Sequence, residues 1–167
     1  QGQTPDLASS LTCWDKHLKS MAMLVLVLLV LELLWGRASL VVFAVFFNTG
    51  MPSTTGVVEA IFNPQNLEFL VVYLAVGGVF ASLVFALSVV SIPMILDRDT
   101  DAISAGLTSL RVFFGEISVI LLWGALISSL TVLSLMSPWS VLLMLVGPWL
   151  GHASWHAYRA SVEWIED

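Results

Sequence analysis

One run of thirty residues, Leu67 to Leu96, contains Glu68 as its only charged side chain. An apolar run longer than about 18 residues is typical of a helix that crosses a bilayer, because only a helix or a closed barrel satisfies its own backbone hydrogen bonds in lipid. Composition agrees, since 58% of all residues are hydrophobic and 11% are charged, whereas soluble domains have about 25% charged residues. The sequence therefore predicts an integral membrane protein.

Three further apolar segments have the same character. Residues 21–47 and 117–136 are long enough to cross the hydrocarbon core of about 30 Å, and residues 139–160 begin as an apolar stretch and end as an amphipathic one. The predicted fold class is therefore an all-α membrane protein with four transmembrane helices, at about 21–47, 67–96, 117–136 and 139–160. They are expected to form a single domain, residues 21–165, that follows a cytoplasmic juxtamembrane segment, residues 1–20.

An amphipathic helix is predicted between the second and third spans, at about 100–114. Its apolar positions recur at steps of four, three and four residues, at Ile103, Leu107, Leu110 and Phe114. Three carboxylates lie before it or at its start, Asp97, Asp99 and Asp101, where negative charge suits the positive end of a helix and an Asp can cap it. The alternative is a bound cation, although the downstream glycine and glutamate of a calcium loop are missing.

The basic residues predict the orientation in the membrane. They precede the first span, lie between the second and third, and end the fourth: Lys16, Lys19, Arg98, Arg111 and Arg159. The two opposite loops contain no basic residue. By the positive-inside rule, both termini and the amphipathic helix are expected in the cytoplasm.

Two charges, Glu32 and Arg37, fall inside the first span. A charge at this depth is costly and normally faces protein or water. The two are five residues apart, which is not the spacing of three or four at which side chains meet best on one helix. Three explanations stay open: they pair with each other, one of them pairs with another helix or subunit, or Arg37 extends to the headgroups.

Small residues recur at intervals of four within the second and third spans. Such residues let two membrane helices approach closely, which is how helices associate in lipid. The positions predicted to form the helix-packing contacts are Gly78, Ser82, Ala86, Gly124 and Ser128.

The residues with the strongest potential for cofactor chemistry are His152 and His156. At a spacing of four they lie on one face of a helix, a geometry that can supply two ligands to a metal or haem. The alternative is a pair of interfacial histidines that bond to Asp97, to Asp99 or to headgroups. Beyond this pair, the sequence predicts no cofactor, no catalytic residue and no enzyme activity.

The topology also predicts a structural cluster on the cytoplasmic side, because the second and fourth spans end there. Asp97, Asp99 and Asp101 are expected to meet the segment from His152 to Arg159. The strongest bond would be a charge-assisted one from Arg159 to Asp97 or Asp99.

Two stretches, FALSVVSIPMILDRDTDAISAGLTSLR and GPWLGHASWHAYR, resemble the bacterial integral-membrane family known as domain of unknown function 2189. Its members share a stretch that ends in DRD or DRDxDA and a terminal GHAxWHAYR. The resemblance spans about Leu18 to Val162 and is most specific at Ser88 to Leu110 and Gly151 to Arg159. It implies the inner membrane of a bacterium, and some members are labelled as candidate cytochrome c oxidase components.

The function expected from these observations is that of a non-catalytic accessory or structural subunit of a larger membrane complex, which the resemblance places in a respiratory or related electron-transfer chain. Its partners would be membrane lipids and the subunits of that complex, and the net charge of −6 argues against nucleic acid. One alternative is a small transporter or channel, in which Glu32, Arg37 and the cytoplasmic Asp and His residues line the path. The other is a haem- or copper-binding assembly factor that uses His152 and His156.

Overall fold

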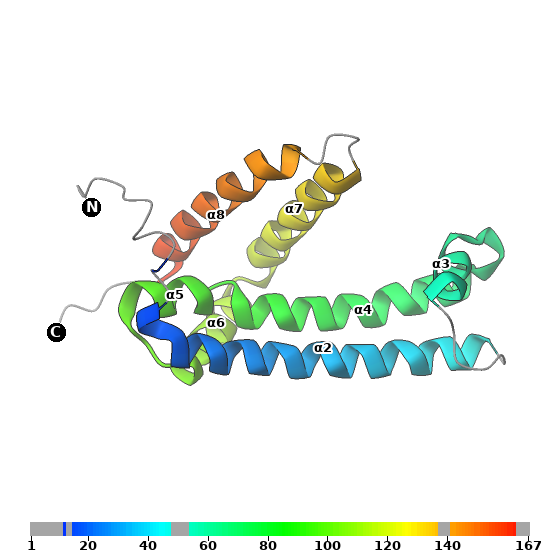
Figure 1. Ribbon diagram of the computed structural model, residues 1–167, viewed down its shortest axis with the longest axis horizontal. Coiled ribbons are helices and arrows are strands. Elements are labelled where there is room, and N and C mark those ends of the chain that lie inside the picture. The colour runs from blue at the N-terminus through cyan, green and yellow to red at the C-terminus, as the bar shows by residue number, and fades with distance from the viewer. Residues whose placement is uncertain (1–11, 13–14, 48–53, 137–140, 163–167) are drawn as a thin grey trace. The chain divides into compact units, whose positions relative to one another are not determined.

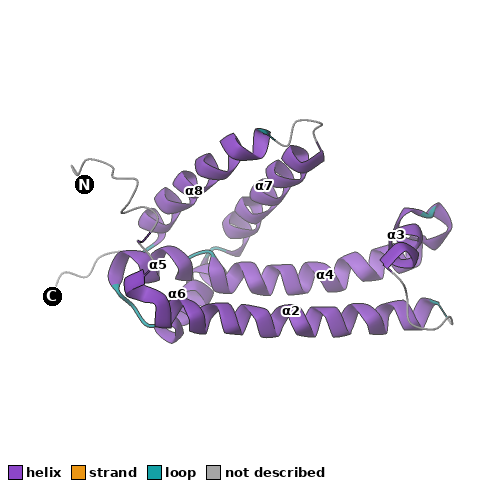
Figure 2. Ribbon diagram, viewed as in Figure 1, coloured by secondary structure: helices purple, strands orange, loops and turns teal. Residues whose placement is uncertain are grey.

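The computed structural model describes residue 12 and residues 15–47, 54–136 and 141–162, and this part of the chain contains helices and no strand (Figures 1 and 2). The predicted all-α class is confirmed. The elements that lie within these described ranges are two short 3-10 turns, Asp15–His17 and Pro64–Asn66, and the α-helices α2 (Leu18–Phe46), α3 (Thr54–Phe62), α4 (Leu67–Ser88), α5 (Ser91–Arg98), α6 (Ala102–Gly115), α7 (Ile117–Met136) and α8 (Leu142–Ser161).

Among the described residues, three helical stretches are long and apolar enough to cross a membrane: Asp15–Phe46, Pro64–Arg98 and Ile117–Met136. Few of their side chains are buried within the protein, as expected where lipid replaces water as the solvent. Helix α8 is not among them, because its second half carries His152, His156 and Arg159. Residues 139 and 140 of the predicted fourth span lie outside the described residues.

The chain divides into two compact units, and the smaller one is Val25–Val84. In it α2 and α4 lie side by side (Figure 1). Phe43, Ala60 and Phe69 are buried between them and α3, and the Phe43 and Phe69 rings meet edge to face at 5.8 Å. Aromatic packing therefore joins the helices at this end.

In the smaller unit, α2 and α4 approach each other closely at Gly77, where an added Cβ would lie 3.2 Å from the indole of Trp35. The predicted packing position is the next residue, Gly78, but a Cβ there would meet nothing within 4 Å. The Ser82 hydroxyl donates a hydrogen bond to the Gly78 carbonyl within its own helix, at 2.7 Å. The large side chain on α2, Trp35, determines which of the two glycines makes the contact.

The larger unit comprises Gln1–Leu24 and Phe85–Asp167. Its core contains Ala86, Phe113 and Ile120, and α7 packs along α8 while α5 contacts both α6 and α8. Gly124 makes a close contact, since a Cβ there would lie 2.9 Å from the Phe85 ring. Of the predicted packing residues in this unit, Ala86 is buried, Gly124 is half-buried and Ser128 is exposed.

Helix α6 is amphipathic in an unexpected way. It buries its small residues together with one phenylalanine: Ala102, Ala105, Gly106, Ser109 and Phe113. The large apolar side chains of Ile103, Leu107 and Phe114 are exposed instead. The face of α6 that carries small side chains permits close packing within the protein. The face that carries the large apolar side chains is available for contact with lipid or with another protein.

The predicted helix over 67–96 is broken in the structure, because α4 ends at Ser88 and α5 begins at Ser91. Proline has no N–H, and its ring clashes with the carbonyl four residues earlier. For Pro93 that carbonyl belongs to Val89. The break therefore lies one helical turn before Pro93.

The hydroxyl of Ser109 bridges the gap that this break leaves. It donates a hydrogen bond to the Ala86 carbonyl at 2.6 Å and accepts one from the Val90 N–H at 3.2 Å. In a continuous helix those two backbone groups would bond to each other. Ser109 is fully buried, so α6 supplies the hydrogen bonds that the broken helix lacks.

Candidate functional site

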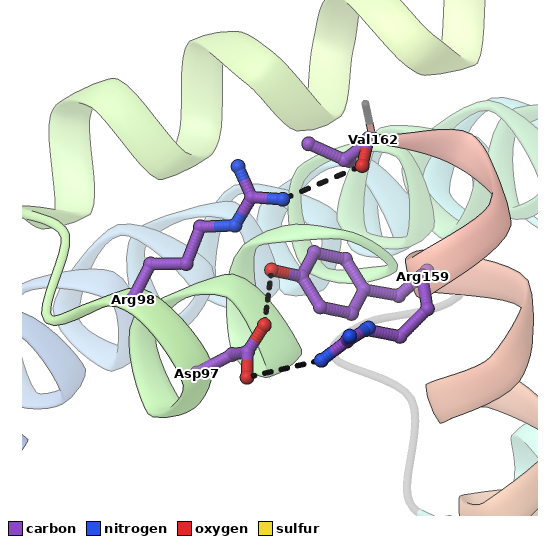
Figure 3. Close-up of polar contacts among 5 residues, drawn as sticks. Asp97, Arg98, Arg159 and Val162 are labelled. Carbon is purple, nitrogen blue, oxygen red and sulfur yellow. Dashed lines mark hydrogen bonds and ion pairs between the residues drawn. The ribbon is translucent and has the colours of Figure 1, made fainter. Parts of the chain in front are cut away.

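The polar cluster of the larger unit is centred on Asp97, in the last turn of α5. Its side chain is only 8% exposed, and the Arg159 guanidinium Nη1 lies 3.7 Å from its Oδ1 (Figure 3). The buried Tyr158 donates its hydroxyl hydrogen to Asp97 Oδ2 at 3.1 Å. Neighbouring residues near the end of α8 therefore hold one carboxylate from two sides.

Arg98 makes a second connection between the same two helices. Its Nη2 donates to the carbonyl of Val162 at 3.3 Å (Figure 3), and its guanidinium carbon lies 5.9 Å from the centroid of the Tyr158 ring. Val162 is the C-cap of α8, and the last carbonyls of a helix lack partners within it. The cation thus satisfies a helix end and contacts an aromatic ring.

The other two aspartates of the acidic run have different roles. Asp99 ends α5 in the left-handed conformation, with φ of 53°, and its Oδ1 lies 2.9 Å from His17 Nδ1. Asp101 caps α6, because its Oδ2 accepts hydrogen bonds from the backbone N–H groups of Ile103 and Ser104, each at 3.0 Å. Hydrogen bonds from Ser104 lower the pKa of the Asp101 carboxyl. The three carboxylates thus have separate partners.

The structure brings Asp97 and Arg159 together, as the topology had predicted. Among the described residues, the two histidines of α8 make no hydrogen bond or ion pair with the aspartates of the acidic run. His152 and His156 contact each other, with their Nε2 atoms 3.2 Å apart and their rings edge to face at 4.6 Å. Asp99 bonds to His17 in place of the α8 histidines. The proposed role of the cluster stays a prediction.

The sequence analysis did not identify Tyr158 as a member of this cluster. The signal for its burial was present in the pattern of α8. Leu150, Ser154, Ala157 and Ser161 share a helical face with Tyr158. Small residues such as Ser and Ala on one face of a membrane helix are typical of close packing. Leu150 and Tyr158 are the two buried residues of α8.

The spacing of the two histidine Nε2 atoms suits a metal as well as a hydrogen bond. Zinc binds imidazole nitrogen at about 2.0–2.1 Å, and two such ligands at a tetrahedral angle are about 3.3 Å apart. Within the described residues, no group of three or more His, Cys, Asp or Glu gathers as a metal site would require. The pair could therefore supply two ligands, and metal binding stays a prediction.

Glu32 and Arg37 are both exposed on α2. Ion pairs among the described residues involve Asp97 and Asp99 and not these two. At 3.6 residues per turn their side chains diverge by about 140° around the helix. The mutual pair that the sequence left open is absent from the structure.

A comparison with protein families gives one match. The model of the family described as a predicted integral membrane protein, domain of unknown function 2189, matches residues 1–97. The chain belongs to this family. No curated protein and no solved structure matches the chain.

Membership of this family confirms the resemblance that the sequence motifs indicated. The match ends at Asp97, so it includes both charges of α2 and the first carboxylate of the cluster. The motif around His152 and Arg159 lies beyond it. The family description and the three apolar helices agree that this is an integral membrane protein.

Proposed function

We propose that this family member is a non-catalytic structural subunit of a larger membrane complex. The observation that carries this proposal is the closed arrangement around Asp97, whose oxygens are engaged by Tyr158 and Arg159 from α8. A catalytic carboxylate needs an accessible face for its substrate, whereas this one is 8% exposed and joins two helices. This arrangement suits a structural role, in which the cluster holds α5 against α8.

We place four spans in this subunit, with both termini in the cytoplasm. The 20 residues of α8 make a helix about 30 Å long, which is the thickness of the hydrocarbon core. Helix α8 packs along α7, itself a candidate span. Its polar last turns would then reach the cytoplasmic headgroups, where Asp97 and Arg159 lie together.

The surface that supports assembly is the exposed stripe of α6, formed by Ile103, Leu107 and Phe114. Arg111 is exposed on the same helix. In the proposed topology α6 lies at the cytoplasmic interface, so part of this stripe faces lipid and part faces a neighbouring subunit. The proposal that the complex belongs to a respiratory or related electron-transfer chain rests on the resemblance to members labelled in that way.

The test is native electrophoresis of membranes solubilised in mild detergent. The tagged wild-type chain should migrate with a larger complex, and mass spectrometry of that band should identify respiratory subunits. Asp97→Ala should release the chain, because it removes the residue that joins α5 to α8. Asp99→Asn is the matched control, since its side chain is 87% exposed. Migration of the wild type without other subunits would refute the proposal.

A second function, binding of copper, zinc or haem iron for an assembly step, is favoured by one observation: the 3.2 Å between the two Nε2 atoms. His152 and His156 would be two of the ligands, and a neighbouring protein or water would complete the set. Titration of the purified protein with Cu²⁺ or Zn²⁺ should then give saturable binding that is lost in His152→Ala and in His156→Ala. Equal binding by the double variant would exclude the pair as ligands.

A further inference from the structure

Within the smaller unit, one face of helix α2 is not packed against the other described helices and has the spacing of a coiled-coil seam. The positions alternate at steps of three and four residues along Leu26, Leu29, Leu33, Gly36 and Leu40, and all five are exposed. Trp35, which contacts α4, lies on the opposite side of the helix. A repeat of 3.5 residues keeps one apolar stripe directed at a second helix over several turns.

No described residue of the smaller unit packs closely against Gly36. A Cβ at this position would meet nothing within 4 Å, although glycine inside a helix costs about 1 kcal/mol relative to alanine. A small residue in the seam lets the backbone of a second membrane helix approach closely. A helix that packs on α2 from outside the smaller unit would account for this glycine.

The two intramembrane charges flank this stripe. If Leu33 and Leu40 occupy the a positions of the heptad and Leu29 and Gly36 the d positions, then Glu32 is at g and Arg37 is at the following e. In a parallel two-stranded coiled coil the g residue of one helix faces the e residue five positions later on the other. The spacing of five that prevents a pair within one helix is therefore the spacing of a pair between two copies.

We propose that α2 is a self-association helix, through which two copies of this chain form a parallel dimer. Glu32 of each copy pairs with Arg37 of the other, so two-fold symmetry gives two reciprocal ion pairs. Copies inserted with the same topology are parallel in one membrane, as this arrangement requires. Both charges gain partners at a depth where an unpaired charge is costly. The dimer is independent of any larger complex in which the chain takes part.

The geometry of the seam is tested by cysteine cross-linking in membranes. Cys13, the single native cysteine, is first replaced by serine. Leu33→Cys should then give a disulfide-linked dimer after oxidation with copper phenanthroline. Leu34→Cys is the control, because it is at the same depth and similarly exposed, at 51% against 63% for Leu33, but points about 100° away. Equal cross-linking at both positions, or none at Leu33, would overturn the proposal.

The charge pairs are tested by exchange of the two residues. Glu32→Arg alone places like charges opposite each other, as does Arg37→Glu alone, and each should reduce the dimer fraction by about tenfold or more. The double variant Glu32→Arg/Arg37→Glu restores both ion pairs with their signs exchanged and should restore the dimer. Dimer fraction is measured by energy transfer between labelled copies in lipid vesicles that contain only this protein.

The double variant also decides whether the charges have another partner. If each single change abolishes the dimer and the exchange fails to restore it, Glu32 and Arg37 do not pair between copies and the inference is wrong. Single variants that dimerise like the wild type would equally refute it. Cross-linking at Leu33→Cys in the double-exchange background separates a restored seam from non-specific aggregation.

Discussion

At the scale of single residues, one hydroxyl substitutes for a backbone hydrogen bond inside the larger unit. Ser109 donates to the Ala86 carbonyl and accepts from the Val90 N–H, both of which are buried. Buried backbone groups without partners are rare because each costs as much as a lost hydrogen bond. The serine therefore allows α4 to end where it does without leaving two orphan groups in the interior.

Ser109→Ala should lower the free energy of unfolding by about 1–3 kcal/mol, since the two backbone groups lose their common partner. Unfolding in mixed micelles with increasing sodium dodecyl sulfate measures this. Ser129→Ala is the control, because that exposed hydroxyl bonds only to the Ala125 carbonyl of its own helix, and it should change little. If both variants lost the same unfolding free energy, the two hydrogen bonds of Ser109 would contribute no more to stability than the single bond of an exposed serine.

Asp101 should make a contribution to stability that depends on pH. Its pKa in the folded protein lies below the ordinary value because Ser104 and the N–H of Ile103 stabilise the ionised carboxylate. A depressed pKa contributes stability that is fully present above the ordinary value, about 3.9, and is lost as the pH falls through the lower folded pKa. The cap thus weakens only in acid.

The measurement compares the wild type with Asp101→Asn between about pH 2 and pH 6. Asparagine also caps helices, so the variant retains a bond without the charge. The difference in unfolding free energy should be constant near pH 6 and shrink toward zero in strong acid. Two curves that stay parallel down to about pH 2 would contradict the assignment.

At the scale of helices, two glycines of the predicted packing pattern differ sharply in their surroundings. Gly124 on α7 lies against the Phe85 ring, where a Cβ would be 2.9 Å away, whereas Gly78 on α4 faces open space. The four-residue spacing of small residues does not distinguish the two glycines. It indicates which positions share a helix face, but it does not indicate which face packs against another helix. The side chain of the facing helix makes the difference.

Gly124→Ala should therefore destabilise the α7 contact, since a methyl group there forces the aromatic ring or the helix to move. The expected cost is about 1–3 kcal/mol, typical of an overpacked interior. Gly78→Ala is the matched control and should be neutral or slightly stabilising, because alanine is the better helix former. Detergent unfolding of the two variants measures both values, and the opposite order would show that the larger unit tolerates the extra methyl.

At the scale of the whole molecule, the sequence predicted the membrane class and the helical segments because lipid demands long, internally bonded apolar runs. It placed Asp97 near Arg159 because both end segments were assigned to the cytoplasmic side. It did not predict the break before Pro93, since the compensating Ser109 is far away in the chain, or the burial of Tyr158. Those features depend on which side chains face one another, and periodicity does not specify that.

The number of membrane crossings determines on which side of the membrane the last turn of α8 lies. Of the predictions made from the sequence, this number most affects the proposed function. Helix α7 begins directly after α6, and α8 returns along α7 so that its last turn reaches α5. If α7 crosses the bilayer, a helix packed along its length and about 30 Å long crosses as well. Arg98, Arg111 and Arg159 then all lie on the cytoplasmic side, in agreement with the positive-inside rule.

Reporter fusions test this directly. Green fluorescent protein, which folds in the cytoplasm, should fluoresce when fused after Ser161, and alkaline phosphatase, which needs export, should be inactive there. Fusions after Met136, at the end of α7, should give the reverse result, because one fewer span has been completed. Active phosphatase after Ser161 would mean three crossings, with α8 on the opposite side of the membrane. The joint at Asp97 could not then form, because Arg159 and Asp97 would be separated by the bilayer.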